Sequence, residues 1–559
     1  MPKPPGPVTG ALQLRRLREI TTVLVKSGFP DLVSRLRLER TVALGRRLRL
    51  RGEPEPWGSR AQRLRQAFEE LGPTFVKFGQ TLSTRADLLP AELVAELSRL
   101  QDQVPPLAPG IAKAAIEAEL GQPIEQVFSE FDPVPVAAAS IAQVHRAVLA
   151  TGEEVAVKVR RPGIETTIER DLAILGQLAR LAERYLPDAE LYHPADLVRE
   201  FAASIRRELD LAREGRTIER FARNFASDPA IRFPRVFRHR TTRGLLTLEY
   251  IHGTKVLDIL PAKDGFDPSV VARRGGDLML RQVLEHGFFH ADPHPANIFV
   301  LPGNVICMLD LGNVGRLTPP LRAALASLVE GVVREDAERM ARALLDIGRP
   351  LHPIDQRQLG RDLSELLDTY AGVTFRDLQI GPLLQEAVSV MRRYRLQFPA
   401  DLMLLVRAFV TIEGIGRQLD PSFCLIDQAR PVVMAILRER LRPSAVAARA
   451  GEVARDVGEA LQALPRDLLE IVGKAKDDQL QIQFVHRNLE HFVHGLDRAS
   501  NRLSFAIVIA ALIVGSSFVL QQGTGPMLFG LPAFGLVGFI AAALLGLWLA
   551  VGILRSGRL

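Results

Sequence analysis

The sequence predicts an α+β protein with two lobes, a helical extension ahead of them and a pair of transmembrane helices at the C-terminal end. Three observations lead to this fold class. Short apolar runs bounded by turn residues, typical of strands, occur at 134–159, 245–253 and 298–309. Helical periodicity dominates 162–228 and most of the chain after residue 312. Two long uncharged runs then follow, and 559 residues suffice for more than one domain.

The positive charge of the chain is concentrated near its beginning. The whole chain has a net charge of +7 and a pI of about 9.6, while residues 1–65 alone contain 15 Lys and Arg against 5 Asp and Glu. Arg alternates with Leu or Val there, which is consistent with basic amphipathic helices. Because no nucleic-acid-binding motif accompanies this charge, the predicted partner is an anionic membrane surface and not nucleic acid. A solvated helical face is the alternative.

The two cysteines, Cys307 and Cys424, lie in unrelated apolar contexts without the spacing of a metal-binding pair. This pattern indicates a reducing compartment and argues against a structural zinc site. The first residues also lack the apolar core of a secretory signal, so no such signal is expected.

One short stretch carries the strongest chemical signal, and it has a counterpart downstream. Residues 290–297 read His-Ala-Asp-Pro-His-Pro-Ala-Asn, and residues 309–312 read Leu-Asp-Leu-Gly. In a protein kinase such a set performs phosphoryl transfer. Asp292 would position or deprotonate the acceptor, while Asn297 and Asp310 would hold Mg²⁺ on the nucleotide phosphates. Between Asn297 and Asp310, two apolar runs split by Pro-Gly-Asn predict a hairpin.

A smaller strand-rich region precedes this stretch. Residues 134–149 predict a strand, a turn of small residues and a second strand, and residues 154–159 predict a third strand that carries Lys158. This is the layout of a kinase N-lobe, where the loop covers the phosphates and the strand lysine pairs with them and with a helical glutamate. Alanines stand where glycines are expected in that loop. The loop residues are Ala137, Ala138, Ala139 and Ser140.

The helical region after this strand must supply the carboxylate for Lys158. Glu208 and Asp210 are two residues apart, and Glu214 lies six residues beyond Glu208. We expect Glu208 to pair with Lys158, and we give Glu214 a regulatory position.

A later strand, at 245–253, ends in polar residues and glycine where an inter-lobe hinge would lie. Its residues Glu249 and Ile251 are therefore candidates for contact with the nucleotide. Further on, Arg407 and Glu413 flank an apolar helix, and their chemistry alone suggests a structural ion pair.

Alternatives without kinase chemistry stay open at this point. The 290–297 stretch could be a polar turn without chemical function, or a metal site built from His290, Asp292 and His294. An isolated strand lysine is more often a solvated charge than a phosphate ligand, and charged helices are usually solvated.

Residues 71–87 predict an amphipathic helix. Phe75, Phe78 and Leu82 fall on one apolar face, and Lys77 and Gln80 share a polar face. Gly79 interrupts this helix at a cost of roughly 1 kcal/mol relative to Ala. Close approach of another element would explain it, and simple tolerance would too.

The end of the chain predicts two membrane-spanning helices. Residues 505–520 and 527–554 contain no charge, and the link between them is uncharged. Arginines at 498 and 502 precede the pair, and arginines at 555 and 558 follow it, which places both flanks on the cytoplasmic side. A buried hairpin of a soluble protein is the alternative.

Assembled in order, these motifs resemble the UbiB (AarF/UbiB) family of atypical protein-kinase-like proteins, which is associated with ubiquinone and other prenyl-lipid metabolism. The resemblance covers roughly residues 65–425. The family's marks are a Lys-x-Gly-Gln motif at Lys77, Gly79 and Gln80, the alanine-rich loop at 137–140, the strand lysine Lys158, a Glu-x-Asp pair at Glu208 and Asp210, the catalytic stretch at 290–297, and the triplet from Asp310 to Gly312. Leu311 replaces the family's Phe and should fill the same packing position.

The resemblance implies a two-lobed kinase-like domain in which the helical extension lays Lys77 and Gln80 over the place of a protein substrate. It also implies that the alanine loop alters nucleotide selectivity and suppresses protein phosphorylation. The implied cofactors are ATP (or ADP) and Mg²⁺. The implied role is a membrane-anchored ATPase or kinase that supports ubiquinone biosynthesis. A nucleotide-switched pseudokinase scaffold is the alternative, and a protein kinase is less favoured.

The expected partners are membrane lipids, prenyl-lipid precursors and ubiquinone-biosynthesis enzymes, at the inner membrane of a bacterium with the kinase-like domain on the cytoplasmic side. Small residues in the second apolar run (Gly535, Gly538, Ala541 and Ala542) would allow helix packing, including a homodimer.

The expected divisions are a basic segment at 1–64, a helical extension at 65–110, an N-lobe with a helical insertion at 111–250, a helical C-lobe at 251–445, a helical linker at 446–502 and the transmembrane hairpin at 503–554. We assign catalysis to Asp292, Lys158 and Glu208; nucleotide binding to Ala137, Ala138, Ala139, Ser140, Lys158, Glu249, Ile251 and Asn297; metal binding to Asn297 and Asp310; and regulation to Lys77, Gly79, Gln80 and Glu214.

Overall fold

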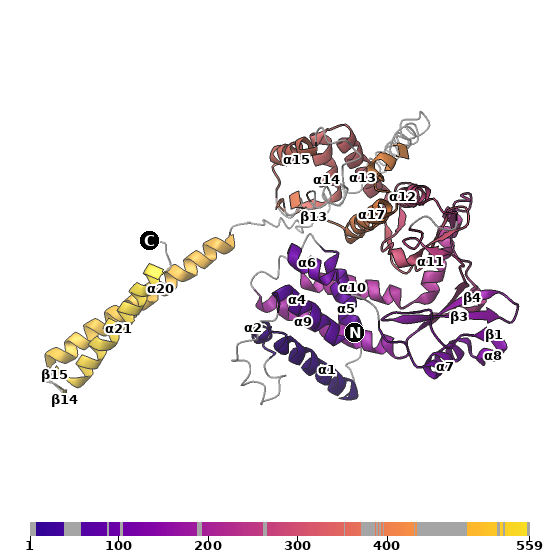
Figure 1. Cartoon of the computed structure of the whole chain (residues 1–559). Coiled ribbons are helices and arrows are strands. Elements are labelled where there is room, and N and C mark those ends of the chain that lie inside the picture. Colours follow the sequence, from indigo (N-terminus) through magenta and orange to yellow (C-terminus); the bar gives the residue numbers. More distant parts are fainter. Residues whose placement is uncertain are drawn as a thin grey trace, which may run out of the picture. The chain divides into compact units, whose positions relative to one another are not determined.

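The structure is a computed structural model of the chain, shown in Figure 1. It describes residues 7–38, 58–85, 89–100, 104–186, 193–260, 265–350, 353–370, 386, 389–390, 393–394, 396–429, 431–432, 489–522, 526–528 and 531–555. The chain divides into two compact units, Met1–Val446 and Ala447–Leu559.

Helices from the beginning of the chain and from the insertion after Lys158 form one helical layer of the first unit (Figure 1). They are α1 (Pro7–Lys26), α2 (Pro30–Arg35), α4 (Arg60–Leu71), α5 (Pro73–Ser83), α6 (Ala91–Leu97), α9 (Ile164–Tyr185) and α10 (Pro194–Glu208). Their apolar faces share one core, which includes Ile20, Phe68, Phe75, Ile168 and Phe201. Arg16 of α1 also pairs with the buried Asp171 of α9, with Nε 2.9 Å from Oδ1. The apolar face of α1 is thus occupied within the protein, and residues 39–57 of the basic segment lie outside the described residues.

An antiparallel sheet forms the first lobe. The elements of this lobe are α7 (Pro109–Leu120), α8 (Ile124–Val127), β1 (Phe128–Phe131), β2 (Ala137–Ala138), β3 (Ala142–Leu149), β4 (Glu154–Arg160), β6 (Leu245–Glu249) and α11 (Leu211–Asn224). The strand order is β1-β3-β4-β6, with β2 paired to β3. Val155, Val157 and Val159 of β4 are fully buried on one face, in a core shared with α7 and β1. Because successive side chains of a strand alternate, Lys158 points to the opposite face.

The second lobe combines short strands with helices. Its strands are β5 (Ile231–Arg232), β7 (Thr254–Lys255), β8 (Phe288–His290), β9 (Ile298–Leu301), β10 (Val305–Met308), β11 (Val314–Arg316), β12 (Arg349–Pro350) and β13 (Leu396–Gln397). Its helices are η4 (Arg238–Arg240), α12 (Pro268–Leu284), η5 (Pro295–Asn297), α13 (Pro319–Val333), α14 (Ala337–Ile347), α15 (Gln356–Tyr370) and α17 (Ala400–Leu419). One sheet has the order β5-β10-β9-β7, and β8 pairs with β11. Residues 250–253 join β6 of the first sheet to β7 of this one, which confirms the predicted hinge between the lobes.

The predicted hairpin after Asn297 is confirmed as β9 and β10. Its strands are joined through Gly303 and Asn304, which both have positive φ (+77° and +59°). Gly and Asn adopt this conformation more readily than other residues, so these two residues allow the tight turn.

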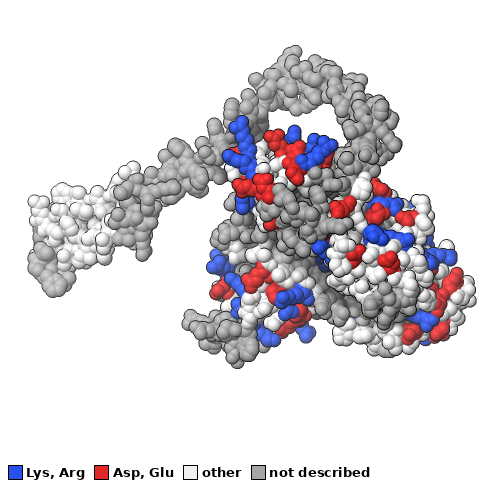
Figure 2. Space-filling model, turned by 45° about the horizontal axis from the view of Figure 1, so that its top comes forward, with Lys and Arg blue, Asp and Glu red and all other residues white. Residues whose placement is uncertain are grey.

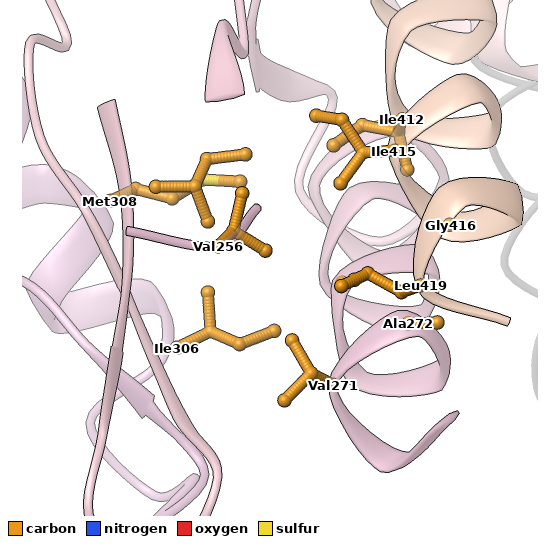
Figure 3. Close-up of a pocket in the computed structure, with 11 residues that line it drawn as sticks. Val256, Val271, Ala272, Ile306, Met308, Ile412, Ile415, Gly416 and Leu419 are labelled. Atoms are coloured by element: carbon orange, nitrogen blue, oxygen red, sulfur yellow. The ribbon is translucent and has the colours of Figure 1, made fainter. Parts of the chain in front are cut away.

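A small cavity of about 20 Å³ lies behind this hairpin, between β9 and β10 on one side and α12 and α17 on the other (Figure 3). Its lining is apolar throughout and includes Ile298, Met308, Ile412 and Leu419. A void of this kind stays dry and offers no group to hold a phosphate. It is therefore not the nucleotide site.

The C-terminal unit is a helical hairpin. α20 (Leu489–Gln522) is followed by the short strands β14 (Met527–Leu528) and β15 (Leu531–Pro532) and by α21 (Ala533–Arg555). Leu503–Gln521 and Ala533–Ala550 are each long and apolar enough to cross a membrane. Large apolar side chains point outward, and the described surface of this unit shows no charged patch in Figure 2, whereas blue and red side chains are interspersed over the first unit.

Small residues bring the two long helices together. A Cβ added at Gly538 would lie 2.1 Å from Oγ of Ser516, and one at Gly535 would lie 2.7 Å from Cγ of Leu520. Ala542 is only 2 % exposed. The small-residue face of α21 therefore packs on α20 of the same chain.

Candidate functional site

Lys158 of β4 lies at the centre of a cluster of charges between the lobes. Its Nζ donates to both carboxylate oxygens of Glu214, each at 2.9 Å, and to Oδ1 of Asp310, also at 2.9 Å. The Glu214 side chain is 5 % exposed and that of Lys158 is 19 % exposed. The strand lysine, a carboxylate of α11 and the predicted metal ligand are thus already in contact.

The expected pair between Lys158 and Glu208 is wrong. Glu208 ends α10, and its carboxylate contacts Nζ of Lys77 at 2.7 Å. Asp210 then caps α11 by accepting the N–H of Arg213 at 3.0 Å, so that Glu208 and Glu214 belong to different helices. Of these two glutamates, Glu214 is the one that contacts Lys158 of β4.

The sequence does carry a signal for Glu214. The buried residues of α11 are Leu211, Glu214, Gly215, Thr217, Ile218 and Phe221, which recur with helical periodicity on one face. A carboxylate on such an apolar face is rarely buried without a partner. That observation alone would have favoured Glu214 over Glu208.

The three charged groups shift one another's pKa. Burial lowers the pKa of Lys158, but the charges of Asp310 and Glu214 outweigh burial and raise the pKa of this lysine above its usual value. The charge of Lys158 lowers the pKa of Asp310, with a smaller contribution from Lys77. Burial raises the pKa of Glu214 to about 7, against the opposing effect of Lys158. The ammonium of Lys158 and the carboxylate of Asp310 are therefore both charged at neutral pH.

The catalytic stretch follows β8. The N–H of Ala291 donates to the carbonyl of Asn313 at 3.0 Å, next to the β8–β11 ladder. Nδ1 of His294 accepts the N–H of Ala296 at 3.2 Å, so this side chain caps the start of η5. In the described part of the chain no three His, Cys, Asp or Glu side chains could hold a metal ion together. His290, Asp292 and His294 therefore do not form such a group in this structure.

Asp292 has a partner that the sequence did not reveal. Its Oδ1 lies 3.2 Å from Nη2 of Arg407 on α17. The expected ion pair between Arg407 and Glu413 is wrong, since Glu413 contacts Arg417 at 3.6 Å, one turn away. Side chains six positions apart on a helix point in different directions. A guanidinium from α17 therefore contacts the residue expected to act on the acceptor.

Asn297 and Asp310 lie at the open end of the β9–β10 hairpin. Met308 pairs with Ile298, and the N–H of Leu309 donates to the carbonyl of Asn297 at 2.8 Å. Asp310 has φ +54°, an unusual conformation that concentrates at functional sites. An amide and a carboxylate supply the oxygen atoms that Mg²⁺ prefers, so this pair fits the ion when phosphates complete its shell. Leu311 is fully buried, as expected for a residue that fills the family's Phe position.

The alanine-rich loop forms a tight turn between β2 and β3. The N–H of Ala139 donates to the carbonyl of Ala142 at 2.9 Å. Arg161 holds this turn in place: its Nε donates to the carbonyl of Ala139 at 2.9 Å and its Nη2 to that of Pro105 at 2.8 Å. Ala137 and Ala139 are exposed, whereas Ser140 is 2 % exposed. The Ser140 hydroxyl is therefore turned away from solvent, unlike the alanines before it.

The helical extension reaches the charge cluster through Lys77 of α5, which contacts Glu208. Nε2 of Gln80 donates to the carbonyl of Leu100 at 3.0 Å. A Cβ at Gly79 would lie 2.3 Å from Leu100 and 2.7 Å from Phe68, so close approach explains the glycine. Gly79 and Gln80 thus fix α5 against its neighbours, and Lys77 faces the site.

The hinge residues lie at the end of β6. Oε1 of Glu249 accepts a hydrogen bond from the Arg232 side chain, and Oε2 accepts the N–H of Arg235 at 3.2 Å. The next N–H, that of Tyr250, donates to the carbonyl of Glu154 at 3.0 Å. Ile251, in the connection itself, is partly exposed.

Three family models match successive parts of this chain. The ABC1 atypical kinase-like domain matches residues 99–344, the UbiB helical domain matches 363–424, and the ABC1/UbiB kinase-like C-terminal domain matches 487–555. The chain is 39 % identical to a "Probable protein kinase UbiB" of Pseudomonas fluorescens, over 78 % of this chain and 83 % of that one.

This chain is also 31 % identical to an "Uncharacterized protein in hydrogenase 1 5'region" of Clostridium pasteurianum, over 97 % of this chain and 99 % of that one. Among solved structures, the complex of Rv3197 with erythromycin from Mycobacterium tuberculosis aligns with a TM-score of 0.46 at 22 % identity. That alignment covers 64 % of this chain and 92 % of the other.

Proposed function

The chain belongs to the UbiB/ABC1 family of atypical kinase-like proteins, and from this premise we propose that it binds Mg-ATP and hydrolyses it or transfers its phosphoryl group. One observation carries the proposal. The Lys158–Glu214 pair is formed, and Asp310 contacts the same lysine at 2.9 Å. In kinases the strand lysine, its glutamate and this aspartate must all be in place for phosphoryl transfer.

Each polar residue has a role in this proposal. Lys158 binds the nucleotide phosphates while Glu214 holds its ammonium in place. Asn297 and Asp310 would hold Mg²⁺, which neutralises charge on the phosphates when bound. Asp292 orients the attacking hydroxyl or water and accepts its proton at the carboxylate.

A role in prenyl-lipid metabolism extends the proposal. The family and the UbiB relatives support an association with ubiquinone biosynthesis, and the two apolar helices support membrane anchoring. We place the kinase-like unit on the cytoplasmic side of a bacterial inner membrane, since arginines flank the hairpin at both ends. Its partners there would be anionic lipids, prenyl-lipid precursors and biosynthetic enzymes, and a homodimer is compatible with this arrangement.

A second function, as a nucleotide-switched scaffold, is favoured by the contact between Arg407 and Asp292. Arg407 occupies Oδ1 of Asp292 at 3.2 Å, so this oxygen is less available to the attacking hydroxyl or water. In this alternative the protein binds nucleotide and changes shape without efficient turnover.

The test is ATP turnover by the purified full-length protein with and without Mg²⁺, and with and without anionic lipid bilayers. Asp310→Asn removes the metal ligand's charge and serves as the inactive comparison. Mg²⁺-dependent turnover that the variant lacks would support the enzyme. Absence of turnover, together with a nucleotide-dependent rise in Tm that Asp310→Asn removes, would support the scaffold. If nucleotide changes neither turnover nor Tm, both functions are rejected.

A further inference from the structure

A group of arginines gathers around one aromatic ring outside the nucleotide site. The guanidinium of Arg220 on α11 lies 4.0 Å from the centre of the Phe288 ring, and that of Arg316 on β11 lies 5.4 Å from the same centre. Because both distances end at one ring, the two cations belong to one local cluster. α11 and β11 thus each place a positively charged side chain next to Phe288.

The sequence of α11 extends this cluster into a stripe. Arg213, Arg216, Arg220 and Arg223 follow one another at spacings of three and four residues, which places them on one face of the helix. The opposite face carries the apolar residues and Glu214. The basic stripe is therefore separate from the apolar face of α11, with Arg216 and Arg223 exposed and Arg213 and Arg220 half-buried.

Most of these cations have no carboxylate partner. In the described part of the chain, the side chains of Arg213, Arg220, Arg223 and Arg316 form no ion pair, whereas Arg216 lies 3.7 Å from Asp210. Burial lowers the pKa of Arg213, and the charges of neighbouring arginines, including Arg316, lower it further. The same two causes lower the pKa of Arg220.

The carboxylates nearby do not balance this charge. Oδ1 of Asp401 accepts the backbone N–H of Arg316 at 3.2 Å, and Asp210 caps the first turn of α11. Glu219, also on α11, is engaged by Arg238. Like charges gathered without enough counter-charges destabilise a fold unless an anion binds among them.

We propose that Arg220 and Arg316, which both lie at the Phe288 ring, form with the neighbouring Arg213 a binding site for a phosphate or diphosphate group that is separate from the nucleotide site. Guanidinium groups bind phosphate oxygens in pairs, and several such forks around one anion give specificity for a multiply charged group. The aromatic ring keeps two of the side chains in place for this purpose.

The position of this phosphate site gives it a route to the catalytic residues. α11 carries Glu214, β8 runs from Phe288 into the stretch with Asp292, and β11 begins four residues after Asp310. An anion held there would join these elements. This consequence rests on the proposed function, whereas the binding itself does not.

The test measures binding of inorganic pyrophosphate to the full-length protein by calorimetry, with a chelator present to remove Mg²⁺. We expect the double variant Arg220→Gln/Arg316→Gln to weaken binding at least 10-fold. Arg238→Gln, which removes an exposed arginine already paired with Glu219, is the matched control and should bind as the unaltered protein does. Lys158→Met should also bind normally, because it alters only the nucleotide site.

The double variant should fold, since it removes repulsion between like charges. Its Tm without ligand should equal or exceed that of the unaltered protein, and pyrophosphate should raise Tm only in the latter. Co-sedimentation with phosphatidylcholine vesicles, with or without phosphatidic acid, identifies the source of the phosphate. A loss of phosphatidic-acid-dependent binding in the double variant assigns a lipid headgroup, and an unchanged vesicle interaction assigns a free diphosphate.

The proposal is overturned if neither pyrophosphate nor phosphatidic acid distinguishes the double variant from the unaltered protein. It is also overturned if Lys158→Met alone abolishes pyrophosphate binding, because the anion would then occupy the nucleotide site. A protein that binds pyrophosphate through the arginines but never binds ATP would refute the proposed function and leave the phosphate site standing.

Discussion

Replacing Glu214 by Gln should separate the role of this residue from that of Glu208. The change keeps the size of the side chain and removes the negative charge that holds Lys158 at two contacts of 2.9 Å. Two unit charges 2.9 Å apart interact by about 6 kcal/mol at an effective dielectric constant of 20. This is an upper value, because burial opposes the pair and leaves Glu214 partly protonated near neutral pH. Asp310 still contacts Lys158, and a hydrogen bond to a charged group contributes roughly 1.5–3 kcal/mol.

We therefore expect a loss of about 2 kcal/mol in the binding of the phosphates, which corresponds to about 30-fold in kcat/KM for ATP. Glu208→Gln is the matched control. It breaks a partly exposed ion pair with Lys77, which contributes at most about 1 kcal/mol. We therefore expect kcat/KM for ATP to fall by at most about 5-fold in this variant.

The assay is steady-state ATP turnover of both variants in the same lipid, with thermal unfolding recorded to show that each is folded. The reasoning is refuted if Glu208→Gln loses as much activity as Glu214→Gln. It is equally refuted if Glu214→Gln stays within about 3-fold of the unaltered protein.

Three further changes test other contacts of the structure. Arg407→Gln should raise ATP turnover, because it frees the carboxylate of Asp292, and should change unfolding by less than about 1 kcal/mol since the pair is partly exposed; reduced turnover would contradict this. Arg161→Ala removes two hydrogen bonds that hold the alanine loop, so amide hydrogen exchange at 137–141 should become faster, and unchanged protection would argue against the clamp. Gly538→Leu should separate α20 from α21 and destabilise the hairpin by about 1–3 kcal/mol in detergent, whereas Gly546→Leu, with nothing within 4 Å of its added Cβ, should not; equal melting of the two would count against the packing.

Site residues can be predicted from the sequence where a local pattern, within one short segment, identifies them. Asn297 and Asp310 lie close together because they flank a hairpin, and the pattern of two strands between them predicts this hairpin. Lys158 is recognisable because it stands on an alternating strand next to a loop of small residues. The apolar hairpin at the end of the chain is visible for a similar reason, since length and lack of charge are local properties.

The partners of these residues are set by tertiary packing and are harder to infer. Spacing could not decide between Glu208 and Glu214, because a helix ends between them and Asp210 starts the next one. Arg407 was placed in a local ion pair, while its actual partner, Asp292, is 115 positions earlier in the chain. Such contacts depend on how α17 docks against the catalytic stretch, which no local pattern encodes.

Glu214 is the partner of Lys158 that the sequence could have identified, and the reason is a general physical one. Glu214 is recognisable because it interrupts an apolar helical face, where an unpaired carboxylate would be too costly to bury. The arginines on the opposite face of α11 are half-buried or exposed, and a charged helical face of this kind looks ordinary in the sequence because such faces are usually solvated. Their lack of partners becomes informative only once Arg316 of β11 joins them at Phe288. The sequence can thus show that a charged residue on an apolar helical face requires a partner. A binding site made of surface charges from different elements can be recognised only in the structure, which shows that they lie together.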